Sequence, residues 1–233
     1  MGAGRSAQRV TIVDYGLGNL FSLQRALKIV GAEVEVTADP DALRHAAVVI
    51  VPGVGAFGDG MEALRARGLI EPLRDAASAG RPILGICLGM QLLFSDSEEF
   101  GRHIGLGFLR GSVVRLRGAD TFGRRVKVPH VGWSELEPPE GQRWVGTIFE
   151  GLAAREAMYF VHSYIPVPED ETIVIARMTY GGSRYCAAVA RDNLVGCQFH
   201  PEKSGEAGLR LLRTFVGMRS GKAAGDMVRS GTC

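Results

Sequence analysis

Short apolar segments alternate with helical patterns along residues 10–94 of the chain. The segments 10–13, 47–51 and 82–86 are apolar or β-branched almost throughout, as strands are when helices cover both faces of their sheet. Between them, apolar residues recur at helical spacing over about 20–30 and 61–79. Strands that alternate with helices in this way predict a parallel sheet between two helical layers.

The second half of the chain is dominated by short strand candidates, over 111–116, 158–161, 172–178, 186–190 and 194–199. Arg191-Asp192-Asn193 separates the last two and suits a hairpin, which implies antiparallel pairing. A final helix is predicted over 206–218. We therefore expect a three-layer α/β fold: a mainly parallel central sheet, helices on both faces and an additional antiparallel strand region. One domain should span 10–218, with a disordered or extended N-terminus over 1–9 and a flexible tail over 219–233.

Composition excludes several classes of function. A net charge of +2 over 233 residues gives no reason to expect nucleic acid or a membrane surface as partner. No segment has the ~18 continuous apolar residues of a membrane span, and no apolar stretch of a secretory signal follows the first residues. The four cysteines form no C-x-x-C pair. We expect a cytoplasmic protein with free thiols.

The pentapeptide Gly85-Ile86-Cys87-Leu88-Gly89 has the form of a nucleophile elbow, between an apolar strand and a helix. Such a turn exposes its central side chain, and the amides and dipole at the start of the helix favour the reactive thiolate of Cys87. The Leu88 amide would be one donor to an oxyanion. The alternative interpretation is that Cys87 is a small buried apolar residue.

A thiol nucleophile usually needs a base, and His200 is the best candidate among five histidines. It follows the last predicted strand, at the edge where parallel sheets place their sites. Glu202, two residues on, would point to the same side and fix the ring tautomer. On its own this pair also fits a turn histidine with a surface glutamate. We interpret His45 and His103 as solvated and His162 as structural.

Glycine-rich segments follow two of the predicted strands and are candidate ligand sites. Gly53, Val54 and Gly55 follow the strand 47–51 and could direct backbone amides at an anion, or could form a simple strand-to-helix turn. Gly16-Leu17-Gly18 lacks the third glycine of a dinucleotide fingerprint, because position 21 is Phe21, and no P-loop is present. Neither a metal-ligand cluster nor a cofactor motif is found, so we expect no metal and no cofactor.

Three blocks, in this order along the chain, resemble class I (triad) glutamine amidotransferases: Pro52-Gly53-Val54-Gly55, Gly85-Ile86-Cys87-Leu88-Gly89-Met90-Gln91 and Gln198-Phe199-His200-Pro201-Glu202-Lys203-Ser204. The resemblance covers about 10–217 and implies a flavodoxin-like fold. It implies that Cys87 attacks the side-chain amide of glutamine, that His200 transfers protons and that Glu202 orients His200. It also implies an oxyanion loop at Gly53, Val54 and Gly55, and glutamine-binding residues Gln91, Glu99, Ser163 and Tyr164.

Further stretches resemble one branch of that family, the glutaminase subunits of imidazole glycerol phosphate synthases: 14–20, 128–133 and 159–164. This resemblance implies a heterodimer with a (β/α)8 synthase (cyclase) subunit, which would receive ammonia in a protected passage. Asn19, Ser22 and Trp133 are candidates for the partner surface by position. Helix capping by Asn19 or Ser22, and ordinary packing of Trp133, are the alternatives.

Two other functions stay open from the sequence alone. One is a different cysteine hydrolase that shares the elbow. The other is a non-catalytic regulatory or binding module that keeps the fold, although the presence of Cys87, His200 and Glu202 argues against it.

Overall fold

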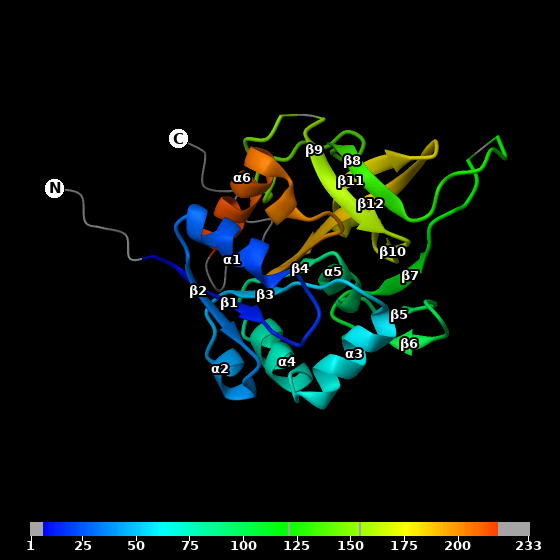
Figure 1. Cartoon of the computed structure of the whole chain (residues 1–233). Coiled ribbons are helices and arrows are strands. Elements are labelled where there is room, and N and C mark those ends of the chain that lie inside the picture. The colour runs from blue at the N-terminus through cyan, green and yellow to red at the C-terminus, as the bar shows by residue number, and fades with distance from the viewer. Residues whose placement is uncertain (1–6, 121, 154, 219–233) are drawn as a thin grey trace.

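The computed structural model describes residues 7–120, 122–153 and 155–218. Its main element is a nine-stranded sheet with a parallel block, which four N-terminal strands and the last strand of the chain form together (Figure 1). The strands of that block lie in the order β2 (Glu33–Thr37), β1 (Arg9–Val13), β3 (Val49–Val51), β4 (Ile83–Ile86) and β13 (Leu194–Cys197), all parallel. Their carboxyl ends therefore meet at one edge, where sheets of this kind place their sites.

Helices cover both faces of the parallel block (Figure 1). On one face lie α1 (Leu20–Ile29) and α6 (Gly205–Val216), and on the other lie α2 (Pro40–Arg44), α3 (Phe57–Ala66) and α4 (Ile70–Ser78). Successive strand residues serve the two sides alternately: Ile50 packs with the α1 and α6 side, whereas Val49 and Val51 pack with the α3 and α4 side. This double burial explains why the strands are continuously apolar.

Beyond β13 the sheet turns antiparallel through β12 (Ser183–Arg191), β11 (Val174–Tyr180), β8 (His130–Glu137) and β9 (Ala157–His162). A short 3-10 helix, Glu171–Ile173, precedes β11. A second, four-stranded sheet contains β10 (Tyr164–Pro168), β7 (Gly111–Arg115), β5 (Asp96–Ser97) and β6 (His103–Ile104). The predicted α/β fold with an additional antiparallel region is confirmed, and the antiparallel part is a continuation of the central sheet.

The structure differs from expectation in several details, and among these the strands β5, β6 and β10 were not predicted. The single helix predicted over 61–79 is two helices, α3 and α4, because Gly68 adopts a φ of +66° that ends the first. The helix after Cys87, α5 (Leu88–Leu92), is short. Strand β8 was not predicted, since its exposed and half-buried residues hide the apolar pattern.

The proposed ends of the domain stay predictions. Arg9 already belongs to β1, while 1–6 and 219–233 lie outside the described residues. Across the described part of the chain, no helix combines the length and the apolar character needed to cross a membrane.

Candidate active site

Cys87 occupies a sharp turn between β4 and α5. Its φ is +53°, a left-handed value that is uncommon outside glycine. The flanking glycines permit the close packing of this turn. A Cβ on Gly89 would lie 1.8 Å from the Val51 carbonyl oxygen, and one on Gly85 would lie 2.6 Å from the Gly89 oxygen. The sequence predicted a tight strand-to-helix turn here, and the structure has one, with the sulfur at the carboxyl edge of the sheet.

His200 and Glu202 lie just beyond the end of β13, which pairs in parallel with β4. His200 Nδ1 lies 2.7 Å from Glu202 Oε1, and the two side chains are only 3% and 4% exposed. The backbone holds the histidine in place, because its N–H donates to Tyr159 O and its carbonyl accepts from the Ser204 hydroxyl. A carboxylate at Nδ1 fixes that nitrogen as the N–H and leaves Nε2 for the reaction.

The charge state of His200 follows from its neighbours. Burial lowers the pKa of His200, but interactions with Cys87 and Glu202 outweigh burial and raise it to about 9. Nε2 is buried and has no hydrogen-bond partner within ordinary geometric limits among the described residues. The arrangement therefore favours an imidazolium beside the Cys87 sulfur, ready to give a proton to a leaving group.

Three further groups approach the sulfur or the loop beside it. The Gln198 side chain donates from Nε2 to Cys87 Sγ at 3.5 Å, and Val161 O lies 3.8 Å from the same atom. The buried Tyr15 hydroxyl donates to Pro52 O at 2.5 Å, and a Cβ on Gly53 would lie 2.2 Å from that hydroxyl. Burial and the nearby Cys87 raise the pKa of Tyr15, so this hydroxyl stays protonated.

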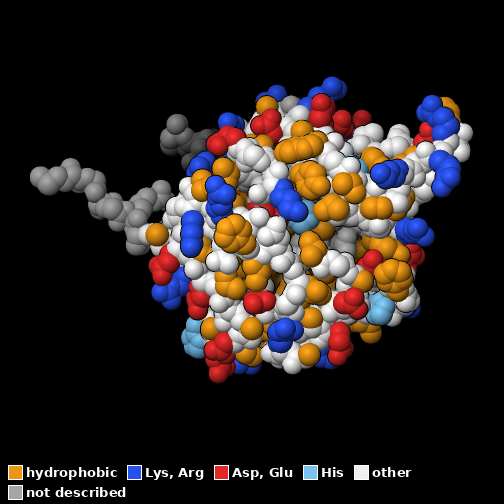
Figure 2. Space-filling model, in the orientation of Figure 1, with side chains coloured by type: hydrophobic (Ala, Val, Ile, Leu, Met, Phe, Trp, Pro, Cys, Tyr) orange, Lys and Arg blue, Asp and Glu red, His pale blue; other side chains and the backbone are white. Residues whose placement is uncertain are grey.

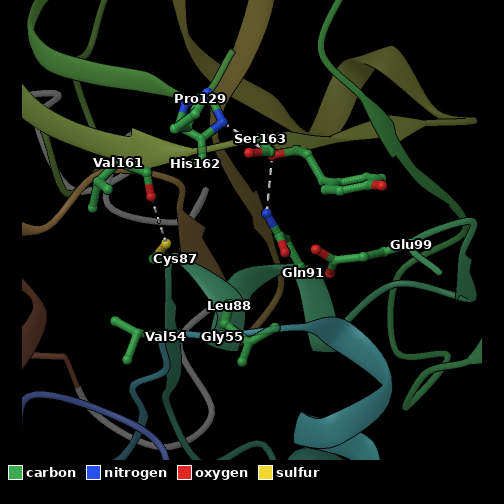
Figure 3. A pocket seen from close by; sticks show the side chains of 11 residues that line it. Val54, Gly55, Cys87, Leu88, Gln91, Glu99, Pro129, Val161, His162 and Ser163 are labelled. Carbon is green, nitrogen blue, oxygen red and sulfur yellow. Dashed lines mark hydrogen bonds between the residues drawn. The ribbon is translucent and has the colours of Figure 1, made fainter.

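A cavity of about 250 Å³ opens beside Cys87 (Figure 3). Its size suits a ligand as small as an amino acid. Glu99 accepts from the Phe57 N–H at 2.7 Å and faces the cavity with the rest of its carboxylate, close to Gln91 (Figure 3). The other lining residues come from the loop after β3, from α5 and from the β9–β10 connection: Val54, Gly55, Leu88, Pro129, Val161, His162, Ser163 and Tyr164.

Behind the cavity, His130 and His162 form a buried pair. His130 Nδ1 lies 3.3 Å from His162 Nε2, and His162 Nδ1 lies 3.0 Å from Tyr164 O. Because a carbonyl only accepts, His162 carries its proton on Nδ1, and its Nε2 accepts from His130. Burial lowers the pKa of His162 to about 3. His162 is therefore neutral at physiological pH and supports the cavity wall, as its structural interpretation predicted.

The family model for class I glutamine amidotransferases matches residues 11–218. The chain is 48% identical over 210 residues to the imidazole glycerol phosphate synthase subunit HisH of Syntrophotalea carbinolica, with 90% of this chain and 100% of the relative covered. It is 46% identical over 211 residues to HisH of Sulfurimonas denitrificans, with 91% and 99% covered. This chain belongs to the class I glutamine amidotransferases, in their HisH branch.

A solved structure of the same fold, PurLQS from Thermotoga maritima, has a TM-score of 0.69 and 23% identity, over 90% of this chain and 97% of that chain. At this identity the likeness concerns the fold alone, and it agrees with the mixed central sheet described above.

The structure brings most of the predicted site residues of this amidotransferase together. Cys87, His200 and Glu202 meet at the sheet edge, and the residues that line the cavity with Cys87 include Val54, Gly55, Leu88, Gln91, Glu99, Ser163 and Tyr164. Gly53 lies beside a second cavity of about 10 Å³, which Asn19, His200 and Glu202 also line. As the first residue of α5, Leu88 has no partner for its N–H within the helix.

None of the residues predicted for the partner surface is among those that line the cavity beside Cys87. Asn19 caps α1 by accepting from the Ser22 N–H, so the capping interpretation holds for it. Trp133 is 58% exposed on β8. Of the two histidines interpreted as solvated, His45 is exposed, whereas His103 is half-buried and its ring lies close to Gly58, which corrects that prediction.

Sequence reasoning missed Gln198 and Tyr15. Gln198 is two residues before His200, so the two-residue period of an extended chain could have placed it on the side of the sulfur. Tyr15 is the second residue after β1, at the same carboxyl edge as Cys87. No group of three or more His, Cys, Asp or Glu side chains that could hold a metal ion occurs in the described ranges.

Proposed function

We propose that this chain is the glutaminase subunit of an imidazole glycerol phosphate synthase and that it hydrolyses glutamine through a thioester on Cys87. The observation that carries the proposal is the alignment of sulfur, imidazole and carboxylate beside a cavity of amino-acid size. Class I amidotransferase activity follows from the family, and the residue roles below are our assignment.

Glutamine would enter the cavity with its charged end away from Cys87. The Glu99 carboxylate is suited to bind the α-ammonium group, because one of its oxygens is already held by the Phe57 N–H at the start of α3. Gln91 donates both of its side-chain N–H groups within the protein and so presents Oε1 as an acceptor. Ser163 and Tyr164 would form the opposite wall.

The reaction then proceeds in two steps. The Cys87 thiolate attacks the side-chain carbonyl carbon of glutamine, and the oxyanion is stabilised by backbone N–H groups of the Gly53–Gly55 loop and of Leu88. The His200 imidazolium gives its Nε2 proton to the leaving nitrogen, and ammonia departs as the thioester forms. His200, now neutral, takes a proton from water, which attacks the thioester and releases glutamate and the thiolate.

Ammonia would pass to a (β/α)8 synthase (cyclase) subunit in a cytoplasmic heterodimer. There it would react with a phosphorylated ribulosyl imidazole-carboxamide to give imidazole glycerol phosphate and an aminoimidazole-carboxamide ribotide. Ammonia in neutral water is largely protonated and no longer nucleophilic, so a protected passage between the two sites favours such a partnership.

A surface beside the active site fits this partner. We call it the Trp133 face, and it consists of Val131, Trp133, Tyr159 and Lys203. Val131 and Trp133 are 52% and 58% exposed, Trp133 packs edge-on against Tyr159, and Lys203 Nζ lies 5.7 Å from the Tyr159 ring centroid. Figure 2 shows hydrophobic side chains gathered over β8 and β9. Exposed aromatic groups such as Trp133 are typical of the centre of an interface.

The test is glutamine turnover by the purified chain, alone and with the synthase subunit and its ribotide substrate. We expect the purified chain to hydrolyse glutamine slowly by itself and much faster with the loaded partner. Cys87→Ala should abolish turnover in both conditions. Glutamine hydrolysis that is absent in every condition, together with a Cys87-dependent peptidase activity, would replace the proposal with the other cysteine hydrolase. No turnover and no Cys87 chemistry at all would indicate the non-catalytic module.

A further inference from the structure

Gln198 is fully buried and contacts both Cys87 and Gln91, two residues that line the cavity. It donates from Nε2 to Cys87 Sγ at 3.5 Å and accepts at Oε1 from Gln91 Nε2 at 3.0 Å. Its carboxamide thus connects the reacting sulfur to a residue that lines the cavity. A buried amide with both ends engaged has a fixed position, since leaving either end unpaired costs free energy.

The direction of this amide is determined by a backbone carbonyl. Gln91 Nε2 lies 3.0 Å from Tyr164 O, and a carbonyl oxygen can only accept, so the Gln91 side chain must turn its NH₂ group that way (Figure 3). The second N–H of the same NH₂ group then points at Gln198, which must present its oxygen. Gln198 is therefore left with its NH₂ group toward the sulfur.

A donor directed at sulfur acts differently on the two forms of a cysteine. A thiolate accepts a hydrogen bond much better than a thiol does, because charge on the acceptor strengthens the bond. In a buried site this preference is larger than in water. The contact from Gln198 consequently favours the ionised nucleophile, in addition to the effect of His200 on the other side.

We propose that Gln198 is a further catalytic residue, whose side-chain N–H stabilises the Cys87 thiolate and whose orientation is set by Tyr164 O through Gln91. The proposal rests on the role of Cys87 as nucleophile given above. Glutamine bound to Gln91 would therefore contact the same series of hydrogen bonds, from Tyr164 O through Gln91 to Gln198, that directs the donor at the sulfur.

Other titratable groups also act on this sulfur and must be kept constant in a test. They are His200 with its partner Glu202, the buried Tyr15, and Cys197. Gln198 is neutral and carries no proton that titrates, so replacing it with an apolar side chain changes the donor without adding or removing a charge.

The experiment compares Gln198→Met, which keeps the side-chain shape and removes both amide groups, with Gln91→Met and with the exposed Gln142→Met as a control for the substitution itself. The rate of iodoacetamide alkylation is followed against pH on the full chain, with mass spectrometry of the Cys87 peptide. Turnover of glutamine is measured with the loaded synthase subunit. Thermal unfolding shows whether each variant is folded, and Gln198→Leu replaces Gln198→Met if that variant is not.

We expect Gln198→Met to raise the pH at which alkylation is half-maximal by ~1 unit and to lower kcat by ~10-fold or more. Gln91→Met should mainly raise KM and move the alkylation midpoint less, and Gln142→Met should match the wild type. If Gln198→Met changed KM but neither kcat nor the alkylation midpoint, Gln198 would only support Gln91 and the proposal would be overturned. A wild type without glutamine turnover would instead contradict the proposed function.

Discussion

Cys87 and His200 come from different strand ends, and interaction with Cys87 helps to raise the pKa of His200. Because they form one unit, we expect Cys87→Ala and His200→Ala each to lower kcat by at least ~10³-fold, and the double variant to be little worse than either single one. Steady-state kinetics with the loaded partner measure this, and Glu140→Ala, at an exposed residue after β8, serves as a folded control. Effects that multiply would show that the two side chains act independently.

In the proposed mechanism the raised pKa of His200 sets the alkaline limit of activity. The imidazolium that would protonate the leaving nitrogen has a pKa of about 9, so it is lost as pH rises through that value. We therefore predict that kcat/KM for glutamine falls above about pH 9. A pH profile of the complex checks this. A fall already complete near pH 7 would show that the interactions with Cys87 and Glu202 do not hold the proton on the ring.

The pKa of His162 is shifted in the opposite direction from that of His200, and the consequence concerns the stability of the fold. Its pKa is lowered to about 3 in the fold, so between about pH 6.5 and 3 the unfolded chain binds the proton and the folded chain does not. Stability should therefore fall as pH decreases through this window, by on the order of 2 kcal/mol from pH 6.5 to 5. Urea unfolding of wild type and His162→Gln at several pH values tests it. An equal pH dependence in both proteins would contradict the assignment.

Among the elements, the β4–α5 turn is the one most sensitive to a single methyl group. A Cβ on Gly89 would lie 1.8 Å from Val51 O, so strand β3 or the turn must move. We expect Gly89→Ala to destabilise the protein by ~2–4 kcal/mol and to abolish most activity. Gly118→Ala is the matched control, because a Cβ there meets nothing within 4 Å. Chemical denaturation measures both, and near-equal stabilities would refute the packing argument.

The elements that the sequence predicted well are those buried on both faces. β3, β4 and β13 are continuously apolar and end beside Gly53, Cys87 and His200, so pattern alone indicated both the sheet and the edge that carries the candidate site. The prediction failed for β8, although Pro138-Pro139 marks its end, because Val131 and Trp133 are exposed and alternate with the small residues Gly132 and Ser134.

Contacts between elements could not be predicted from local pattern. Gln198 reaches the sulfur only because β13 lies beside β4. Its amide is oriented only because the carbonyl of Tyr164, at the start of β10, accepts from Gln91 on α5. The break between α3 and α4 could not be predicted for a similar reason. A single glycine within a helical pattern can stay helical, and only the structure shows that Gly68 adopts a positive φ and ends α3.

At the scale of the whole molecule, the active site lies next to the Trp133 face, and Tyr159 links the two. Its ring packs against Trp133, while its backbone carbonyl accepts from the His200 N–H at 2.9 Å. We predict that Trp133→Ala weakens partner binding by ~1–3 kcal/mol and reduces activation of glutamine turnover. Titration calorimetry with the synthase subunit measures it, and Val145→Ala, at a residue 59% exposed, is the control. Unchanged affinity would place the interface elsewhere.

The central claim is that the Cys87 sulfur is the nucleophile and that His200 activates it. A diazo-ketone analogue of glutamine, incubated with the chain, its loaded partner or both, tests this directly by mass spectrometry. We predict one adduct per chain, on Cys87, suppressed by excess glutamine and formed far more slowly in His200→Ala. No adduct on Cys87 with the loaded partner present, or equal labelling of wild type and His200→Ala, would contradict the account.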